Sequence, residues 1–271
     1  DTQQWYRSTF QKDYDRLIFS AAFRRLQDKT QVFPLAQTDY VRTRLTHSLE
    51  VSSVARSIGM LVGQHLANNF SIGDFRASDI GTILSAAALA HDIGNPPFGH
   101  AGEDGIGQFF ADSAVGQKAL EEMNPAQKQD LLNFEGNAQA FRLLTKLQNV
   151  DNDGGMQLSL STLASFIKYP CGSLERKKLD NIALKKFNYF QAEKESFRHV
   201  VETLGLLPLL KENNETVAWA RHPLVYLLEA ADDLCYSLVD IEDAYRLSLV
   251  SSERVIEFYE SIIKPYGGFP N

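Results

Sequence analysis

Two histidines and two aspartates are of the types that could bind a metal ion: His47, the adjacent pair His91–Asp92, and Asp232. Imidazole and carboxylate groups together are typical ligands of a divalent ion in a hydrolytic site. Neighbouring residues on a helix diverge by about 100°, so this pair can share one ion only near a helix end, which Gly94 would provide, or where the ion sits between the two side chains. The alternative is a His–Asp hydrogen bond in the core that binds no metal.

A second pair suited to chemistry follows in the segment IGNPPFGHAGED. His100 and Glu103 are three residues apart and would share one face of a helix that begins near His100. Histidine and glutamate are residue types that transfer protons, and the pair comes just after the predicted metal ligands. The alternative is that Glu103 only stabilises the first turn of that helix through the helix dipole.

Other polar residues are spaced as if they lined the same cavity. Asp232, Tyr236 and Asp240 recur every four residues along a helical segment whose remaining faces are apolar. A polar stripe on an enclosed helix is typical of a cavity wall. Gln31 and Arg44 precede the first histidine and could supply an amide and a guanidinium, and the planar guanidinium matches phosphate.

The elements that would position these residues are helical. Apolar residues recur at spacings of three and four, and no strand–helix–strand alternation indicates a parallel sheet. The patterns predict five helices: Thr43–His65, Ser78–Gly94, Asn133–Leu147, Ser161–Lys168 and Leu224–Leu249. Short strands are predicted only at residues 31–35 and 216–220.

One segment, Lys168–Arg198, differs in charge from the rest of the chain. It holds eight Lys or Arg residues against four Asp or Glu residues, with aromatic residues between them. Such a segment is either a solvated loop or a surface that contacts phosphates or a nucleic-acid strand. The sequence leaves both interpretations open.

Composition excludes several classes of protein. The 271 residues carry 27 basic and 34 acidic side chains, a net charge of −7, so nucleic acid could bind only at a local basic patch. Two cysteines cannot form a disulfide framework, which favours a reducing cytoplasm. No apolar run predicts a membrane span and no signal peptide is recognised. The chain lacks an initiator Met and stops after YGGFPN, so a fragment is expected.

Five motifs in order carry a family resemblance: RLTHSLEVS, HDIGNPPFGHAGE, NFEGNAQAFR, KYP and RHPLVYLLEAADDLCYSLVDIEDA. Together they resemble the bacterial deoxyguanosine triphosphate triphosphohydrolases (dGTPases) of the HD superfamily, relatives of the animal dNTP triphosphohydrolase with a sterile-alpha-motif domain. The similarity runs from about Asp13 to Tyr245. A lone His–Asp dipeptide is weak evidence, whereas five motifs in the right order are specific.

The resemblance implies an all-α fold, an HD-domain helical bundle with minor β-hairpin content. It implies a single HD-type phosphohydrolase domain over residues 1–271 that lacks the C-terminal helical part of full-length members. It also implies assembly as homo-oligomers, often hexamers, and for some members single-stranded DNA as an effector.

The resemblance also implies roles for individual residues. One divalent ion, Mg²⁺ or Mn²⁺, would be held by His47, His91, Asp92 and Asp232, and His100 and Glu103 match the catalytic pair. Gln31 and Asp240 match positions that hold the sugar 3′-hydroxyl, and Tyr236 matches the residue that packs on the deoxyribose. Positions near the phosphates are matched by Arg44, Asn137, Lys168 and Tyr169.

The implied function is hydrolysis of dGTP or another dNTP at the α-phosphorus, giving deoxynucleoside and tripolyphosphate. Two rivals remain. One is another HD phosphohydrolase, such as a 5′-nucleotidase or cyclic-nucleotide phosphodiesterase, which needs no triphosphate-binding residues. The other is a non-catalytic nucleotide or single-stranded DNA sensor, which predicts loss of a ligand or of the acid–base pair. Base preference cannot be read from the residues.

Overall fold

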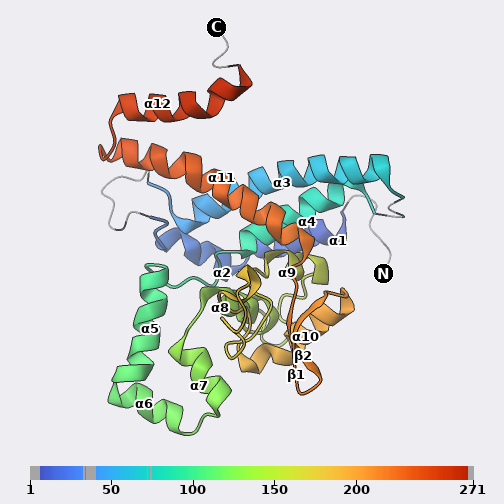
Figure 1. Cartoon of the computed structure of the whole chain (residues 1–271), viewed down its shortest axis with the longest axis vertical. Helices are drawn as coiled ribbons and strands as arrows, with labels where there is room; N and C mark the ends of the chain where they lie inside the picture. The colour runs from blue at the N-terminus through green and yellow to red at the C-terminus, as the bar shows by residue number, and fades with distance from the viewer. Residues whose placement is uncertain (1–6, 33, 35–40, 72, 74, 268–271) are drawn as a thin grey trace.

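The protein is described here by a computed structural model, which covers residues 7–32, 34, 41–71, 73 and 75–267. These residues form α-helices and one small β hairpin, so the predicted all-α class with a minor hairpin is confirmed (Figure 1). The α-helices are α1 (Thr9–Ile18), α2 (Ala21–Arg24), α3 (Arg44–Asn69), α4 (Ala77–Ala90), α5 (His100–Asp112), α6 (Ala114–Glu121), α7 (Pro125–Leu132), α8 (Gly136–Arg142), α9 (Leu160–Phe166), α10 (Lys194–Thr203), α11 (Pro223–Arg246) and α12 (Ser252–Ile263). The strands are β1 (Pro208–Glu212) and β2 (Glu215–Trp219). Within the described residues, no helix is both long enough and apolar enough to cross a membrane.

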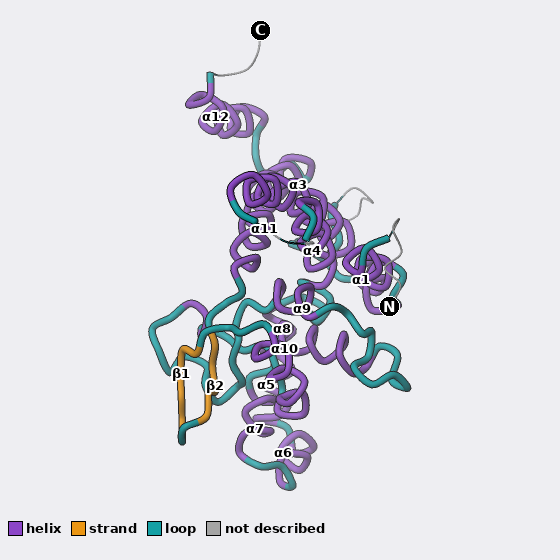
Figure 2. The backbone as a smooth tube through the Cα atoms, turned by 90° about the vertical axis from the view of Figure 1, so that its right-hand side faces the viewer, coloured by secondary structure: helices purple, strands orange, loops and turns teal. Residues whose placement is uncertain are grey.

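Helix α4 is the centre of the fold. Eleven of its 14 residues are buried, because its Ala-rich sequence lets α1, α3, α9 and α11 pack closely around it. Figure 1 shows α3, α4 and α11 side by side in the upper half of the molecule, and Figure 2 shows the same grouping from the side. The three helices that carry the predicted metal ligands are therefore packed against one another.

Small residues set the spacing between α3 and α4. A Cβ atom added at Gly59 of α3 would lie only 2.7–2.9 Å from Gly81 Cα, Gly81 N and Ile80 O of α4. The two backbones thus meet at a distance that only glycine permits. Because His47 and His91 extend from these same two helices, this close approach also helps to set the distance between them.

Replacing Gly59 with alanine is expected to lower the free energy of unfolding by about 2–3 kcal/mol, since the added methyl group overpacks a backbone contact. Urea denaturation measures the effect. The matched control is Gly105→Ala in α5, where an added Cβ meets nothing within 4 Å and the change should stabilise by about 0.5–1 kcal/mol. A Gly59→Ala protein as stable as the wild type would contradict this account of the packing.

The lower half of the molecule is built from shorter elements (Figures 1 and 2). Helices α5, α6 and α7 lie on one side, and the β hairpin lies beside α10 on the other. The hairpin turn is formed by Asn213 and Asn214, whose φ angles are 49° and 66°. Positive φ at both residues is what a two-residue turn requires in order to match the twist of the strands. The predicted strand at residues 216–220 is confirmed as β2, and its partner β1 was not predicted.

Several element boundaries differ from the sequence prediction: α3 ends at Asn69 rather than His65, and α11 ends at Arg246 rather than Leu249. Helix α4 ends at Ala90 rather than at Gly94, because the His91 side chain caps it: its Nδ1 donates to Ala88 O at 2.6 Å. The predicted helix at residues 133–147 begins at Gly136, after the capping side chain of Glu135, and ends in a π-helical turn. The predicted strand at residues 31–35 lies partly outside the described residues, and its described residues form bends and a turn.

Candidate functional site

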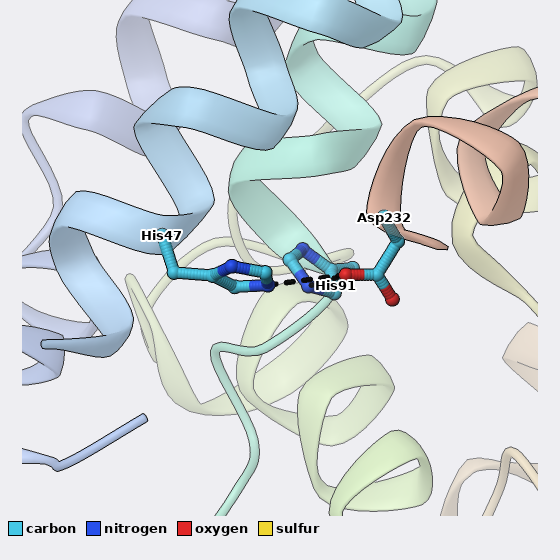
Figure 3. A group of neighbouring side chains, drawn as sticks. All are labelled: His47, His91 and Asp232. Atoms are coloured by element: carbon cyan, nitrogen blue, oxygen red, sulfur yellow. Dashed lines mark hydrogen bonds and ion pairs between the residues drawn. The ribbon is translucent and has the colours of Figure 1, made fainter. Parts of the chain in front are cut away.

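Three of the four predicted metal ligands converge in the centre of the fold. His47 comes from the first turn of α3, His91 from the end of α4 and Asp232 from the middle of α11 (Figure 3). One ligand atom from each lies within 4.8 Å of the other two. His47 Nε2 is 3.1 Å from Asp232 Oδ1, and His91 Nε2 is 3.7 Å from the same oxygen. Residues 185 positions apart thus meet at one point.

The His91 ring is oriented as a metal ligand would be. Its Nδ1 donates to Ala88 O, so Nε2 is the ring nitrogen that faces His47 and Asp232. This Nε2 is buried and has no hydrogen-bond partner among the described residues. A buried polar atom without a partner is costly, and a cation would satisfy it. The donor set of two imidazoles and a carboxylate therefore fits a divalent ion.

Asp92 lies beside this group but faces other partners. Arg44 Nη1 donates to Asp92 Oδ2 at 2.7 Å, and Asn95 Nδ2 donates to Oδ1 at 2.5 Å. Asp92 Oδ1 is 3.7 Å from His91 Nε2, which is too far for a hydrogen bond. Asp92 therefore remains a predicted ligand, next to the three that converge, and Arg44 is held beside the site through it.

Both buried aspartates are held in the charged form. Burial favours the neutral acid, but His91, His47 and Lys168 outweigh it and keep the pKa of Asp232 well below its usual range. For Asp92, burial is likewise outweighed by His91, Arg44 and His47, and its pKa is lowered. Two ionised carboxylates therefore lie next to two imidazoles and supply the anionic oxygens that a cation binds, while Arg44 and Lys168 pair with them.

Helix α11 is tied to α3 by a partly exposed cluster of charges. The Arg42 guanidinium, just before α3, bonds Glu50 of α3 at 2.9 Å and Glu242 of α11 at 2.8 Å, and it also pairs with Asp243. The Asp243 side chain is 5% exposed, so this contact fixes α11 from the inside. The cluster thereby holds Asp232 against His47.

A cavity of about 720 Å³ opens next to the metal-ligand group. Ten of the thirteen predicted site residues line it: Gln31, Arg44, His91, Asp92, His100, Asn137, Lys168, Tyr169, Asp232 and Tyr236. His47 lies behind Tyr236, and Glu103 lies behind His100. Asp240 does not line the cavity, because eight residues along a helix rotate a side chain by about 80° from Asp232. Its role at the sugar remains a prediction.

His100 and Glu103 form the pair that the sequence predicts, at the start of α5. His100 Nδ1 donates to Glu103 Oε2 at 2.7 Å, and Glu103 Oε1 accepts from Gly136 N at 2.7 Å. The His100 side chain is 80% exposed, whereas that of Glu103 is 8% exposed. The buried carboxylate therefore fixes the imidazole and leaves its Nε2 free to exchange a proton.

The backbone before His100 is unusual. Phe98 and Gly99 both have positive φ, 65° and 55°, a conformation that is costly for a residue other than glycine. A Cβ at Gly99 would lie 2.7 Å from Arg44 Nη2. Glycine at this position lets the loop pass close to the guanidinium, which brings His100 and Arg44 to the same cavity wall.

Tyr236 lies between the metal-ligand group and the cavity. Its ring centroid is 5.0 Å from that of His47, and its hydroxyl accepts a hydrogen bond from Gln31 Nε2 at 2.8 Å. Gln31 and Tyr236 are far apart in the sequence, and both line the cavity. The pair forms a rigid wall against which a flat or ring-shaped ligand could pack.

Lys168 and Tyr169 are positioned by a buried arginine that the sequence analysis did not single out. Arg221 Nε donates to Lys168 O at 2.7 Å, and its guanidinium lies 5.6 Å from the Tyr169 ring centroid. Lys168 Nζ in turn donates to Asp232 Oδ2 at 3.2 Å. This chain of contacts directs the ammonium group into the cavity next to the metal-ligand group.

Two further functional residues were missed. Lys186 lines the cavity, with its Nζ 3.3 Å from Glu103 Oε2 and 3.1 Å from Glu135 Oε2. Glu135 is 4% exposed and accepts from Asn137 Nδ2 at 2.7 Å. The signals were present, because Glu135 belongs to the NFEGNAQAFR motif and Lys186 to the basic segment. Sequence alone, however, does not tell an inward lysine from a solvated one.

The basic segment 168–198 divides into two groups. Lys168, Lys185 and Lys186 line the cavity, as expected of a phosphate-contacting surface. Lys178 pairs with Glu212, and Arg198 pairs with Glu215, on the exterior. The exterior pairs fit a solvated loop, whereas contact of the three cavity lysines with phosphates stays a prediction.

Comparison with known proteins shows which proteins the chain is similar to. Residues 44–136 match the family described as the HD domain. The whole chain is 47% identical over 279 aligned residues to a "deoxyguanosinetriphosphate triphosphohydrolase-like protein" of Synechocystis sp., and it covers 63% of that relative. A protein of the same name from Pseudomonas aeruginosa is 48% identical over 92% of the chain and 54% of the relative. A "deoxyguanosinetriphosphate triphosphohydrolase" of Klebsiella pneumoniae is 34% identical over 92% and 52%.

The chain spans between about half and two thirds of the length of these curated relatives. The matched HD region includes His47, the pair His91–Asp92, and His100 with Glu103. Asp232 lies beyond that region, and the longer alignments cover nearly the whole chain. The chain thus contains a region that matches the HD domain, and over nearly its whole length it is homologous to the bacterial deoxyguanosinetriphosphate triphosphohydrolase and triphosphohydrolase-like proteins.

Proposed function

We propose that the protein hydrolyses a deoxynucleoside triphosphate at the α-phosphorus and releases deoxynucleoside and tripolyphosphate. One observation carries the proposal: the buried His47–His91–Asp232 group, the exposed His100 imidazole and the Lys168 and Lys186 ammonium groups adjoin one cavity. Its volume of about 720 Å³ falls within the range of small-molecule sites. The names of the relatives make dGTP the first substrate to test.

The residues fit a divalent cation, Mg²⁺ or Mn²⁺, held by His47, His91 and Asp232 with Asp92 beside them. When bound there, such an ion supplies Lewis-acid polarisation of a phosphate oxygen and lowers the pKa of a water molecule. The negative charge of the two aspartates and the unpartnered His91 Nε2 are the features of this chain that favour it.

His100 is the proposed acid–base group. Glu103 keeps the proton on His100 Nδ1, so Nε2 can take a proton from the attacking water or give one to the leaving 5′-oxygen. Arg44, Lys168 and Lys186 line the same cavity. Their positive charges would offset the charge that develops on the triphosphate as the ester bond breaks.

Product analysis tests the proposal. Full-length protein is incubated with each dNTP and Mg²⁺ or Mn²⁺, and both products are separated by ion-exchange chromatography. Tripolyphosphate and deoxynucleoside are expected in equal amounts. Orthophosphate or pyrophosphate in place of tripolyphosphate would reject this chemistry and favour another kind of HD phosphohydrolase. Binding without turnover would favour a nucleotide sensor.

Tyr236→Ala is expected to reduce discrimination between dGTP and GTP about tenfold or more, because a ring pressed against C2′ leaves no room for a hydroxyl. The ratio of kcat/KM for the two substrates measures it. Tyr236→Phe is the matched control: it keeps the ring, loses the hydrogen bond from Gln31, and should retain most of the discrimination. An unchanged ratio in the alanine variant would remove the proposed role.

Lys186→Met is expected to raise the pKa of Glu103. In the wild type, burial opposes ionisation of Glu103, but Lys186, the Gly136 N–H and His100 outweigh it and lower the pKa below the ordinary 4.5. Without the Lys186 ammonium group, less positive charge opposes the effect of burial. The Glu103 carboxyl group should therefore take up its proton at a higher pH. NMR titration of carboxyl carbons in ¹³C-glutamate-labelled protein measures this, with Glu103→Gln to assign the signal. Lys118→Met on α6 serves as the control, and the same titration in both variants would contradict the prediction.

The proposal extends to the whole protein. We propose that residues 1–271 form one HD-type domain, that the protein assembles as a homo-oligomer, and that it acts in the cytoplasm. The unpaired cysteines, Cys171 and Cys235, support a reducing compartment. Exposed apolar side chains on α11 and α12, including Leu234, Ile256 and Ile262, support subunit contacts. The basic segment leaves single-stranded DNA as a proposed effector.

A further inference from the structure

Glu135 is a buried acid that the proposed chemistry does not use. Its carboxylate lies between Asn137 and Lys186: Asn137 Nδ2 donates to Oε1 at 2.7 Å, and Lys186 Nζ donates to Oε1 at 3.2 Å. Both partners line the 720 Å³ cavity, whereas Glu135 itself does not. One buried carboxylate therefore accepts hydrogen bonds from two side chains that face the cavity.

Lys186 is shared with the catalytic pair. Its Nζ is 3.3 Å from Glu103 Oε2, so the ammonium group lies between the carboxylates of Glu103 and Glu135. His100, Glu103, Glu135 and Lys186 also line a second cavity of about 380 Å³. Lys186 thus belongs to a wall between two open spaces. The ion pairs with Glu103 and Glu135 are the contacts that hold its ammonium group in this wall.

Simple electrostatics does not explain an acid at this place. A negative charge beside an anion-binding cavity repels a polyphosphate, and its burial also costs free energy. Capping of α8 does not require glutamate either, since asparagine, aspartate and serine cap helices well. A carboxylate that reaches both Asn137 and Lys186 is explained if it orients them.

We propose that Glu135 is a positioning residue, whose carboxylate holds the Lys186 ammonium and the Asn137 carboxamide at the cavity wall where phosphate groups of the substrate meet them. The inference deepens the proposed function and rests on it for the identity of the substrate. The orientation of Lys186 and Asn137 by Glu135 depends only on the contacts of Glu135 and not on which substrate binds. Glu135 acts through its two partners and does not touch the substrate.

The test is a double-mutant cycle read out by binding of inorganic tripolyphosphate to full-length, metal-free protein in isothermal titration calorimetry. Glu135→Gln removes the charge and keeps the shape, and it should weaken binding at least fivefold. In a Lys186→Met background the same change should cost no more than about twofold, because one of the two oriented groups is already gone. The matched control is Glu122→Gln, an exposed glutamate after α6.

The direction of the change in tripolyphosphate binding distinguishes a positioning role of Glu135 from an effect of its charge alone. If Glu135 contributed only its charge, Glu135→Gln would tighten tripolyphosphate binding. Unchanged or tighter binding, additive effects in the cycle, or a wild-type protein that does not bind tripolyphosphate would each overturn the proposal. If Glu135→Gln does not fold, Glu135→Asp replaces it in the cycle, since it keeps the cap and withdraws the carboxylate from Lys186 by one methylene.

A kinetic arm separates this inference from the proposed function. With the dNTP that the wild type hydrolyses, Glu135→Gln should raise KM at least fivefold and change kcat less than KM. A purely structural role would lower the melting temperature and leave KM unchanged. If the wild type releases no tripolyphosphate from any dNTP, the proposed function fails alone, and the binding cycle still decides on Glu135.

Discussion

An Asp232→Asn protein is expected to lose at least about a thousandfold in kcat/KM for dNTP hydrolysis, equivalent to about 4 kcal/mol of transition-state stabilisation. Asparagine keeps the shape of the side chain but removes the charge, which His47, His91 and Lys168 hold in the ionised form. The carboxylate also supplies an oxygen that lies 3.1 Å from His47 Nε2 and 3.7 Å from His91 Nε2. Steady-state kinetics measures the loss, and titration calorimetry with Mn²⁺ should show binding weakened in parallel.

An exposed aspartate outside the cavity provides the control for this experiment. Asp112→Asn removes the same charge at the end of α5, where the side chain is exposed, and kcat/KM should change less than about fivefold. Circular dichroism checks the fold, because Lys168 loses its partner in the Asp232 variant. Full activity of Asp232→Asn with unchanged Mn²⁺ affinity would remove Asp232 from the metal site.

A His100→Asn protein is expected to lose about 10²- to 10⁴-fold in kcat, the usual contribution of a general acid or base, with KM changed less than about threefold. The side chain is 80% exposed, so its loss should leave the thermal unfolding midpoint unchanged. The experiment therefore separates chemistry from folding unusually well. Rapid-quench single-turnover kinetics measures the chemical step directly.

The control is His65→Asn, an exposed histidine near the far end of α3. It should match the wild type in both kcat and stability. A Glu103→Gln variant should also lower kcat, because glutamine cannot hold the Nδ1 proton of His100 as a carboxylate does. If the His100→Asn protein hydrolysed the dNTP at the wild-type rate, His100 would not be the acid–base group, and that role would belong to another residue.

The convergence of the metal ligands could be predicted because it follows from residue type and from helix packing. His47, His91 and Asp232 are polar residues within apolar helical patterns, and such residues are buried only where partners meet them. The helices that carry them were predicted within a few residues. The sequence did not show that Asp92 turns to Arg44 and Asn95, because that choice depends on side-chain directions at the end of α4.

The wall formed by Lys186 and Glu135 could not be predicted for a different reason. Residues 168–190 contain little regular secondary structure, so no periodicity indicates which lysines face inward. Lys186 points into the cavity because the loop packs against α8 through Cys171, Leu184 and Phe187. Only the folded chain brings this loop to Glu103. In a charge-rich loop without regular secondary structure, the residue pattern therefore does not indicate which side chains face a cavity.

The Arg42 cluster has a consequence for how the protein would lose activity. Asp232 reaches the two histidines only while α11 stays docked, and the ion pairs of Arg42 are charged contacts that join α11 to α3. Partial detachment of α11 would separate the ligands and leave α4 and its apolar surroundings intact. Inactivation would then begin as a sub-global opening, at temperatures where most of the helical structure still survives.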